Sequence, residues 1–525
     1  MRSPSHVKFP SSLTRLSFVV SAVLACAPLT AQTSAALRRP ARATAPATIP
    51  ALFLSDIHFD PFLDPTKAAA LNAAPEVSWP HILAGGHSTA LTAAQQSAFQ
   101  ACSNQTDTSY ALWQSTLTEL RKTAASSRFV VLSGDLLGHQ FDCKYKALVD
   151  GATAASYLDF TLKTARYVLA TLQAALPGVP IYTALGNNDS GCVDYALDAH
   201  DDAFLAGVAP LIAQAANVAP ADRTSVERDF ALLGAYNAPL AALPHTRIVS
   251  MDDLYLSAKY STCSGAHDAV PAANAIAWLK TQLDLARAAH ERVWFVGHIP
   301  PGVDLYATAR RLANVCGGAK PTMFLGSEDL AQSLAANSDV VRLALFGHTH
   351  DDEMRLLTPD DGQAQTANAR SSAERTIPQS AEPAPVAITG VPLKIVASIT
   401  PVHGNRPSFM LARVDPATAT LIDYTVMMAS NPAVTPITWS REYTYSATYH
   451  KPAFDAASLT ALIADFQGDP GDKWPISQAY IRNYFPAEPA AAAANSAVIS
   501  AAWQPYACSL DHVTAKSFAA CTCGK

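Results

Sequence analysis

The sequence predicts an α/β protein in which buried strands alternate with amphipathic helices. Hydrophobic residues make up 49% of the 525 positions and charged residues 15%, so the chain can bury a large core and is not disordered throughout. Short runs rich in Val, Ile, Leu and Phe recur, each bounded by Gly, Asp or Ser. Segments with helical periodicity separate these runs, and this alternation is typical of a layered α/β domain.

The first element is a targeting segment. Residues 1–31 contain three basic residues followed by an uncharged apolar stretch from Leu16 to Ala27. This pattern is typical of a secretory signal peptide, and the stretch is too short for a membrane span, so we expect a secreted or periplasmic protein without a transmembrane span. Cleavage before Cys26 would instead leave a lipid anchor, and the sequence leaves this alternative open. Residues 32–50 are rich in Pro and Ala and predict a linker.

Residues 51–440 are predicted to form the main domain. Six apolar runs predict buried strands: Ala51–Leu54, Phe129–Leu132, Ile181–Leu185, Val293–Val296, Leu343–Phe346 and Leu393–Ile399. Three segments between them predict helices: Tyr110–Ala125, Tyr157–Leu176 and Ala272–His290, which follows Pro271. Residues 359–389 are polar and proline-rich and predict a long mobile surface loop. Two antiparallel strands are predicted after it, at Phe409–Val414 and Thr420–Met427.

Residues 441–525 are predicted to form a small helical appendage that carries three cysteines. Of the nine cysteines in the chain, eight remain when Cys26 is set aside with the signal segment. An even number suits disulfides in an exported protein. The spacing by itself does not fix the pairing.

Side chains that bind metals follow five of the predicted strands. The runs end in the motifs Asp56-x-His58, Gly134-Asp135, Gly186-Asn187-Asn188-Asp189, Gly297-His298 and Gly347-His348-Thr349-His350. Glycine in front of a ligand lets the backbone turn tightly. Because ligands in α/β sheets lie beyond the carboxyl ends of strands, these side chains are expected to meet. The candidate metal ligands are Asp56, His58, Asp135, Asn187, His298, His348 and His350.

This set of ligands suits two divalent metal ions. Two ions about 3.5–4 Å apart can clamp a phosphate and activate a water, and one carboxylate must bridge them, which Asp135 can do. Mixed nitrogen and oxygen ligands favour zinc, with iron or manganese as alternatives. The net charge is −6, and loss of three basic residues with the signal segment makes it −9 (−6 − 3). This charge argues against a nucleic-acid polymer as partner.

In this order the motifs resemble those of the calcineurin-like metallophosphoesterase superfamily. The segments Asn274–Gly302 and Ser398–Phe409 are also similar to acid sphingomyelinase and its secreted phosphodiesterase-like relatives. The resemblance implies a four-layer α/β/β/α sandwich with a dinuclear centre. One metal would be held by Asp56, His58, Asp135 and His350, and the other by Asp135, Asn187, His298 and His348. The resemblance further implies two disulfides, Cys508–Cys521 and Cys263–Cys316.

One position departs from the family pattern. Asn188 stands where most members have His, and a neutral amide donates hydrogen bonds but gives up no proton. His139, four residues after Asp135, is then the best remaining general acid. The resemblance implies that Asn188 and His139 contact the phosphoryl oxygens. His403 and Arg406 are further candidates for substrate contact.

The resemblance implies a secreted phosphodiesterase in which a hydroxide between the metals attacks a phosphoester small molecule or a phospholipid head group. Because the Gly-Asn-Asn-Asp motif is similar to that of endopolyphosphatase-type members, hydrolysis of polyphosphate or of a nucleoside polyphosphate is an alternative. A non-catalytic exported binding protein is a third reading, which the complete set of ligands opposes. A purple-type acid phosphatase is not supported, because Gly138 stands where that group has its Tyr ligand.

Overall fold

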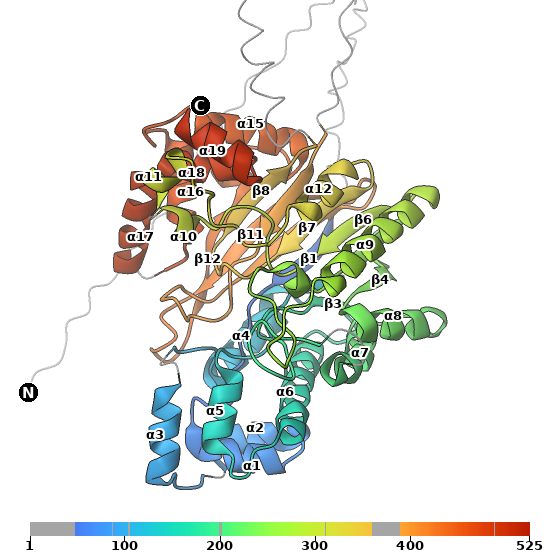
Figure 1. The fold of residues 1–525 in the computed structure, drawn as a ribbon, viewed down its shortest axis with the longest axis vertical. Helices are drawn as coiled ribbons and strands as arrows, with labels where there is room; N and C mark the ends of the chain where they lie inside the picture. Colours follow the sequence, from blue (N-terminus) through green and yellow to red (C-terminus); the bar gives the residue numbers. More distant parts are fainter. Residues whose placement is uncertain are drawn as a thin grey trace, which may run out of the picture. The chain divides into compact units, whose positions relative to one another are not determined.

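Two six-stranded sheets form the centre of the computed structural model (Figure 1). The structure describes residues 48–359 and 389–524, apart from 87, 103–104, 199–201, 310 and 488. The sheet orders in these residues are β12-β11-β10-β1-β2-β3 and β4-β5-β6-β7-β9-β8. The first sheet contains β1 (Ile49–Leu54), β2 (Val130–Ser133), β3 (Ile181–Ala184), β10 (Ser408–Asp415), β11 (Thr420–Ala429) and β12 (Trp439–Thr444). The second contains β4 (Tyr236–Pro239), β5 (Thr246–Ser250), β6 (Arg292–Val296), β7 (Val341–Phe346), β8 (Glu353–Leu357) and β9 (Val391–Ile395).

The parallel strands lie at one end of the first sheet and at the centre of the second. β1, β2 and β3 pair in parallel, as do β5, β6, β7 and β9, whereas β10–β12, β4 and β8 pair antiparallel. All six predicted buried runs are strands, and β10 and β11 pair as predicted. The run predicted at Leu393–Ile399 ends earlier, because β9 stops at Ile395. The chain then crosses to the carboxyl end of β1, where the Thr400 amide donates to the Asp56 carbonyl.

Four of the described strands were not predicted from the sequence: β4, β5, β8 and β12. β12 is half-exposed along much of its length, and β4 is an edge strand, so neither forms a continuous apolar run. β5 contains the half-buried Arg247, and β8 includes Glu353 and Arg355, which are buried and paired at 3.2 Å. Charged residues inside a strand break the hydrophobic pattern by which buried strands are recognised.

The two sheets pack face to face. Trp294 of β6 is fully buried, and its ring contacts those of Phe53 in β1 and of Phe129 at the start of β2, with centroids 5.9 and 5.5 Å apart. Its indole Nε1 donates to the carbonyl of Ala419, beside β11, at 2.9 Å. Aromatic pairs in this edge-to-face geometry add to the free energy gained by burial.

Helices cover the outer face of each sheet. α4 (Tyr110–Thr123), α6 (Ala154–Ala175) and α7 (Ala203–Ala215) share one core with β1–β3, and α9 (Val270–Ala288) and α12 (Asp329–Ala336) form a second core with β5–β7. This arrangement is the expected four-layer α/β/β/α sandwich. The predicted helices correspond to α4, α6 and α9, and a proline stands in the first turn of α9 as predicted. The remaining helices before β10 are α1 (Ala68–Ala73), α2 (Trp79–His81), α3 (Ala93–Ala101), α5 (Phe141–Leu148), α8 (Pro220–Leu233), α10 (Leu305–Ala309) and α11 (Leu312–Cys316).

A group of helices follows β12 and forms the C-terminal appendage (Figure 1). Phe466, Tyr480 and Trp503 of these helices belong to the same hydrophobic core as β1, so the appendage packs against the sheets. β12 spans the predicted domain boundary at 440, which stays a prediction. The helices are α14 (Tyr445–Tyr449), α15 (Ala456–Gln467), α16 (Pro475–Tyr484), α17 (Pro489–Ala501), α18 (Trp503–Ser509) and α19 (Ala515–Cys523).

The eight cysteines outside the signal segment form four disulfides. The pairs are Cys102–Cys143, Cys192–Cys263, Cys316–Cys523 and Cys508–Cys521. The Cys508–Cys521 pairing is confirmed, and the expected Cys263–Cys316 pairing is wrong. The reason is tertiary: the segment before Cys263 pairs with Tyr195 through backbone hydrogen bonds, whereas α11, which ends at Cys316, packs against α19.

Some predicted segments lie outside the described residues. These are the signal peptide with Cys26, most of the linker and nearly all of the loop 359–389. Among the residues that are described, none of the helices combines the length and apolar character needed to cross a membrane.

Candidate metal centre

The seven predicted ligands meet at the carboxyl ends of β1, β2, β3, β6 and β7. Asp135 Oδ2 lies 3.2 Å from both His58 Nε2 and His298 Nε2, so this carboxylate stands between two histidines from different sheets. Asn187 Oδ1 lies 3.2 Å from His298 Nε2 and 2.8 Å from His348 Nδ1. On the other side, Asp56 Oδ1 lies 3.4 Å from His350 Nε2 and 3.8 Å from His58 Nε2. The side chains around His58 and those around His298 therefore meet at Asp135.

Five of these ligands have a left-handed backbone. The φ angles are 47° at Asp56, 42° at His58, 54° at Asp135, 73° at His348 and 64° at His350. Side-chain-bearing residues adopt this conformation rarely and at a cost of about 1–3 kcal/mol each. Such strain persists only where the surrounding structure holds it, and it gathers at functional sites.

The glycines in front of the ligands serve two purposes. Gly134 has φ 93°, which confirms the tight turn predicted before Asp135. Gly347 has no such φ and is needed for space, because a Cβ there would collide with Ser55 Oγ and Asp56 Oδ2.

Backbone carbonyls set the orientation of two histidine rings. His58 Nδ1 lies 2.9 Å from the Leu137 carbonyl, and His298 Nδ1 lies 2.7 Å from the Ser133 carbonyl. Because a carbonyl can only accept, each Nδ1 carries a proton, and Nε2 is the nitrogen that faces the centre. This orientation is the one that a metal-binding imidazole needs.

The residues fit a pair of metal ions. Of the described residues, Asp56, Asp135 and His298 form one group whose ligand atoms all lie within 4.8 Å of one another, and His58, His139 and His350 form a second. His58 Nε2 is buried and has no hydrogen-bond partner in the described part of the chain, although it points at Asp135. A metal ion would satisfy this atom, and the donors are the nitrogens and carboxylate oxygens that zinc, iron and manganese bind.

The charged side chains of the centre, Asp135 and His298, are buried. Burial disfavours the charge of Asp135, yet His298 and His58 hold its pKa well below the usual range. Burial would likewise lower the pKa of His298, but the Asp135 carboxylate raises it to about 10. The centre therefore attracts positive charge strongly.

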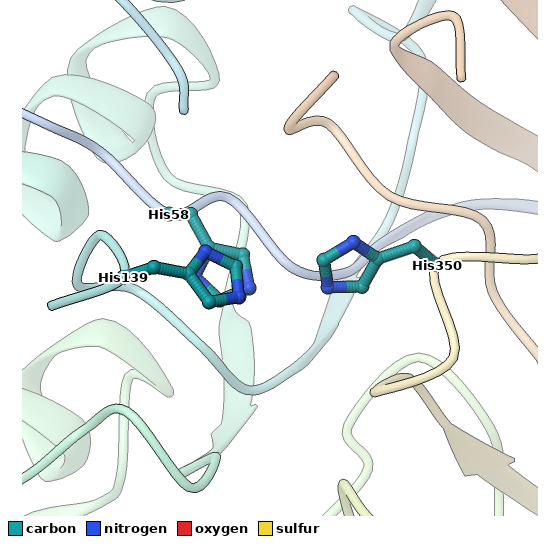
Figure 2. A group of neighbouring side chains, drawn as sticks. All are labelled: His58, His139 and His350. Atoms are coloured by element: carbon teal, nitrogen blue, oxygen red, sulfur yellow. The ribbon is translucent and has the colours of Figure 1, made fainter. Parts of the chain in front are cut away.

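His139 lies beside His58 and His350. Its ring stacks on that of His58, with centroids 4.0 Å apart and planes 13° apart, and His350 faces both rings across the centre (Figure 2). The side chain is 19% exposed, and its Nδ1 lies 2.8 Å from Asp107 Oδ1. The Asp107 carboxylate also accepts from the His139 backbone amide at 2.7 Å. The His139 ring is thus fixed, with Nε2 left for other partners.

Asn188 contacts the ligand Asp135. Its backbone amide donates to Asp135 Oδ1 at 2.8 Å, and its side-chain Nδ2 donates to Asp135 Oδ2 at 3.0 Å. The predicted contact of Asn188 with phosphoryl oxygens remains a prediction, and it would require the second of these bonds to be exchanged. His403 lies nearby, its ring 4.9 Å from that of His350, and Arg406 follows in the same loop.

Two more buried carboxylates support the ligand loops. Asp253 accepts from the amides of His298 and Ile299, at 2.8 and 2.9 Å. Asp189 accepts from the amides of Leu136, Leu137 and Gly186, which fixes the Asp135 turn. Burial raises the pKa of each to about 7, with the Asp135 charge adding to the effect at Asp189.

Sequence reasoning missed Asp107 and Asp253 and gave Asp189 no role. Asp253 follows the apolar run before Met251 and carries the strand-end signal by which the ligands were found. Asp107 lies in a polar segment far from any motif, so nothing in the sequence identifies it.

The comparison with known proteins assigns the family. The model of the calcineurin-like phosphoesterases matches residues 49–352. The chain belongs to the calcineurin-like phosphoesterase family. It is therefore a hydrolase that acts on phosphoesters, and its ligand motifs all lie inside the matched range.

Two relatives in this family have names that specify phosphodiesters. Sphingomyelinase phosphodiesterase C of Dictyostelium discoideum is 23% identical over 48% of this chain and 50% of its own length. Cyclic GMP-AMP phosphodiesterase SMPDL3A of Mus musculus is 23% identical over 69% of this chain and 71% of its own length. The chain thus spans about half the length of the first relative. A dimetal phosphatase structure from Danio rerio covers 73% of this chain and 96% of its own, but its TM-score of 0.37 at 11% identity is too low to bear on the argument.

Proposed function

We propose that this chain is an exported phosphodiesterase that works with two metal ions, most suitably zinc. The observation that carries the proposal is the meeting of seven nitrogen and oxygen ligands around one shared carboxylate, Asp135. When bound, two divalent ions would hold the phosphate oxygens and lower the pKa of the attacking water. One ion would be held by Asp56, His58, Asp135 and His350, and the other by Asp135, Asn187, His298 and His348.

His139 acts as the general acid in this proposal. Asp107 accepts the Nδ1 proton at 2.8 Å, which leaves Nε2 to face the substrate, and in the imidazolium form the Nε2 proton passes to the departing oxygen of the ester. Asn188 contributes by holding the Asp135 carboxylate in place through two hydrogen bonds.

The proposed substrates are phosphodiesters of small molecules or of phospholipid head groups. The names of the two relatives support this class, since one specifies sphingomyelinase and the other cyclic GMP-AMP. The predicted signal segment and the four disulfides support export, with a lipid anchor on Cys26 as its alternative form.

Initial rates on bis(p-nitrophenyl) phosphate and on long-chain polyphosphate, side by side, test the proposal. The protein would be the mature chain loaded with zinc, and Asp135→Asn would serve as the matched blank. Faster turnover of the diester is expected. If neither substrate is hydrolysed above the blank and the protein holds no metal, the chain would be a binding protein instead.

A second candidate is hydrolysis of polyphosphate or of a nucleoside polyphosphate. The observation that favours it is Asn188, since a phosphoanhydride leaving group needs less protonation than an alkoxide. The net charge of −9 expected after loss of the signal segment (−6 − 3) opposes it, because a long polyanion needs a basic track. Faster phosphate release from polyphosphate in the same assay would select this candidate.

A further inference from the structure

The loop after β3 contains a candidate ligand, Asn187, and two residues that contact candidate ligands, Asp194 and Tyr195. Asn187 Nδ2 donates to Asp194 Oδ1 at 2.7 Å. With the amide nitrogen engaged there, Oδ1 faces His298 Nε2 and His348 Nδ1. Without the Asp194 carboxylate, the Asn187 side-chain amide is free to rotate by 180° and to present its NH2 group to the centre, and this group is a donor that cannot bind a metal.

Tyr195 contacts the neighbouring ligand. Its Oη lies 3.3 Å from His348 Nε2, and the two rings meet edge to face. When a metal ion binds His348 at Nδ1, next to the Asn187 oxygen, Nε2 carries the ring proton and would donate it to Tyr195 Oη. Lys259 donates to the same Oη at 3.5 Å and lies over the ring, 4.6 Å from its centroid. Tyr195 thereby fixes which nitrogen of His348 is free for a metal.

A disulfide fastens this loop. Cys192 of the loop forms a disulfide with Cys263. Next to this disulfide, the Ser261 amide donates to the Tyr195 carbonyl at 3.1 Å. Tyr195 has φ 58°, a conformation that persists only when its surroundings hold it. His58 has separate support from the Leu137 carbonyl, on the other side of the centre.

We infer that Asp194 and Tyr195 are positioning residues for the second metal, orienting its ligands Asn187 and His348, and that the Cys192–Cys263 disulfide holds them in place. The inference rests on the proposed two-metal function. Partners of metal ligands typically change metal affinity by about 10–100-fold when removed. Loss of Asp194 or Tyr195 should therefore weaken the second site and spare the first.

The test measures zinc retained per chain against increasing chelator, for the zinc-loaded mature protein. Asp194→Ala and Tyr195→Phe should release one of the two ions at about 10–100-fold lower chelator than the parent protein does. Matched controls are Asp229→Ala, whose carboxylate accepts from Trp278 Nε1, and Tyr260→Phe, whose hydroxyl donates to the Leu197 carbonyl. Both controls should retain zinc as the parent does.

A conservative variant separates orientation from general damage. Asp194→Asn keeps an acceptor oxygen for Asn187 and should restore much of the zinc retention lost in Asp194→Ala. Removing the disulfide with Cys192→Ser and Cys263→Ser should mimic the loss, and removing Cys102–Cys143 by the same change should not. Thermal unfolding of the metal-free variants checks that each is folded.

The outcomes separate this inference from the proposed function. Parent-like zinc retention in Asp194→Ala and Tyr195→Phe would overturn the inference, as would equal losses in the two controls. A parent protein that holds two zinc ions but hydrolyses no phosphodiester would refute the proposed function while the zinc measurement still decides the inference.

Discussion

Replacing Asp107 with Ala tests the role of His139. The carboxylate is fully buried and accepts from His139 Nδ1 at 2.8 Å, from the His139 amide at 2.7 Å and from Thr400 Oγ1 at 3.0 Å. Burial opposes its charge, but the hydrogen bond from His139 holds the pKa of Asp107 well below its usual range. The carboxylate therefore holds the His139 ring through a charge-assisted bond.

The expected loss follows from the energy of that bond. A hydrogen bond to a charged group contributes about 1.5–3 kcal/mol, which corresponds to roughly 10–150-fold in rate if it serves only to orient the general acid. The stacking of His139 on His58 at 4.0 Å remains in the variant, so the loss should stay within this range. Complete removal of a general acid costs about 10²–10⁴-fold.

The assay compares phosphodiesters that differ only in their leaving group. Asp107→Ala should be nearly normal with p-nitrophenolate and should lose progressively more rate as the leaving alcohol becomes less acidic. Thr400→Val, which removes one contact to Asp107 without touching His139, is the control and should lose less. Adding Asp107→Ala to His139→Ala should cause little further loss.

Two results would refute this reasoning. An equal loss on every leaving group would mean that His139 does not protonate the departing oxygen. A large further loss in the double variant would mean that Asp107 acts through another residue.

Three more predictions concern the metals, the pH dependence and the core. Asp135→Asn should abolish metal loading and turnover, and full turnover in a metal-analysed sample would contradict the assignment of ligands. Burial, and secondarily the charge of Asp352, raises the pKa of Glu442 to about 8, from 4.5. As the pH rises, the unfolded chain releases this proton before the folded chain does. The free energy of unfolding should therefore fall between pH 4.5 and pH 8, by up to about 1.4 kcal/mol per pH unit. Glu442→Gln should flatten that part of the pH profile of the unfolding temperature. Trp294→Ala should destabilise the sheet interface by about 3–5 kcal/mol and Trp294→Phe by less, as measured by denaturant unfolding; equal losses would argue against the packing account.

Most of the parallel strands and the candidate ligands could be predicted because one local pattern encodes both. A buried parallel strand is a short apolar run, and a residue at its carboxyl end lies at the edge where ligands gather, so Asp56, Asp135 and His298 are found by their position after such runs. Strands with charged or half-exposed residues lack this pattern. β8, with its buried ion pair of Glu353 and Arg355, and the half-exposed β12 therefore went unpredicted.

Two of the partner residues, Asp107 and Tyr195, could not be predicted, since their contacts join distant parts of the chain. Asp107 reaches His139 from 32 residues away, and the contact of Tyr195 with His348 spans 153 residues. The disulfides follow the same rule. Cys316 pairs with Cys523 across 207 residues, because helix packing and not spacing brings α11 to α19.

The sequence by itself determined the α/β class, the candidate metal ligands and their place after the strands, because hydrophobic periodicity and strand-end residues are local properties. Only the tertiary structure decided which nitrogen of each histidine faces the centre, which carboxylates hold the ligand loops and which cysteines pair. Those features depend on hydrogen bonds and packing between segments far apart in the chain, and such contacts exist only once the two sheets have closed on each other.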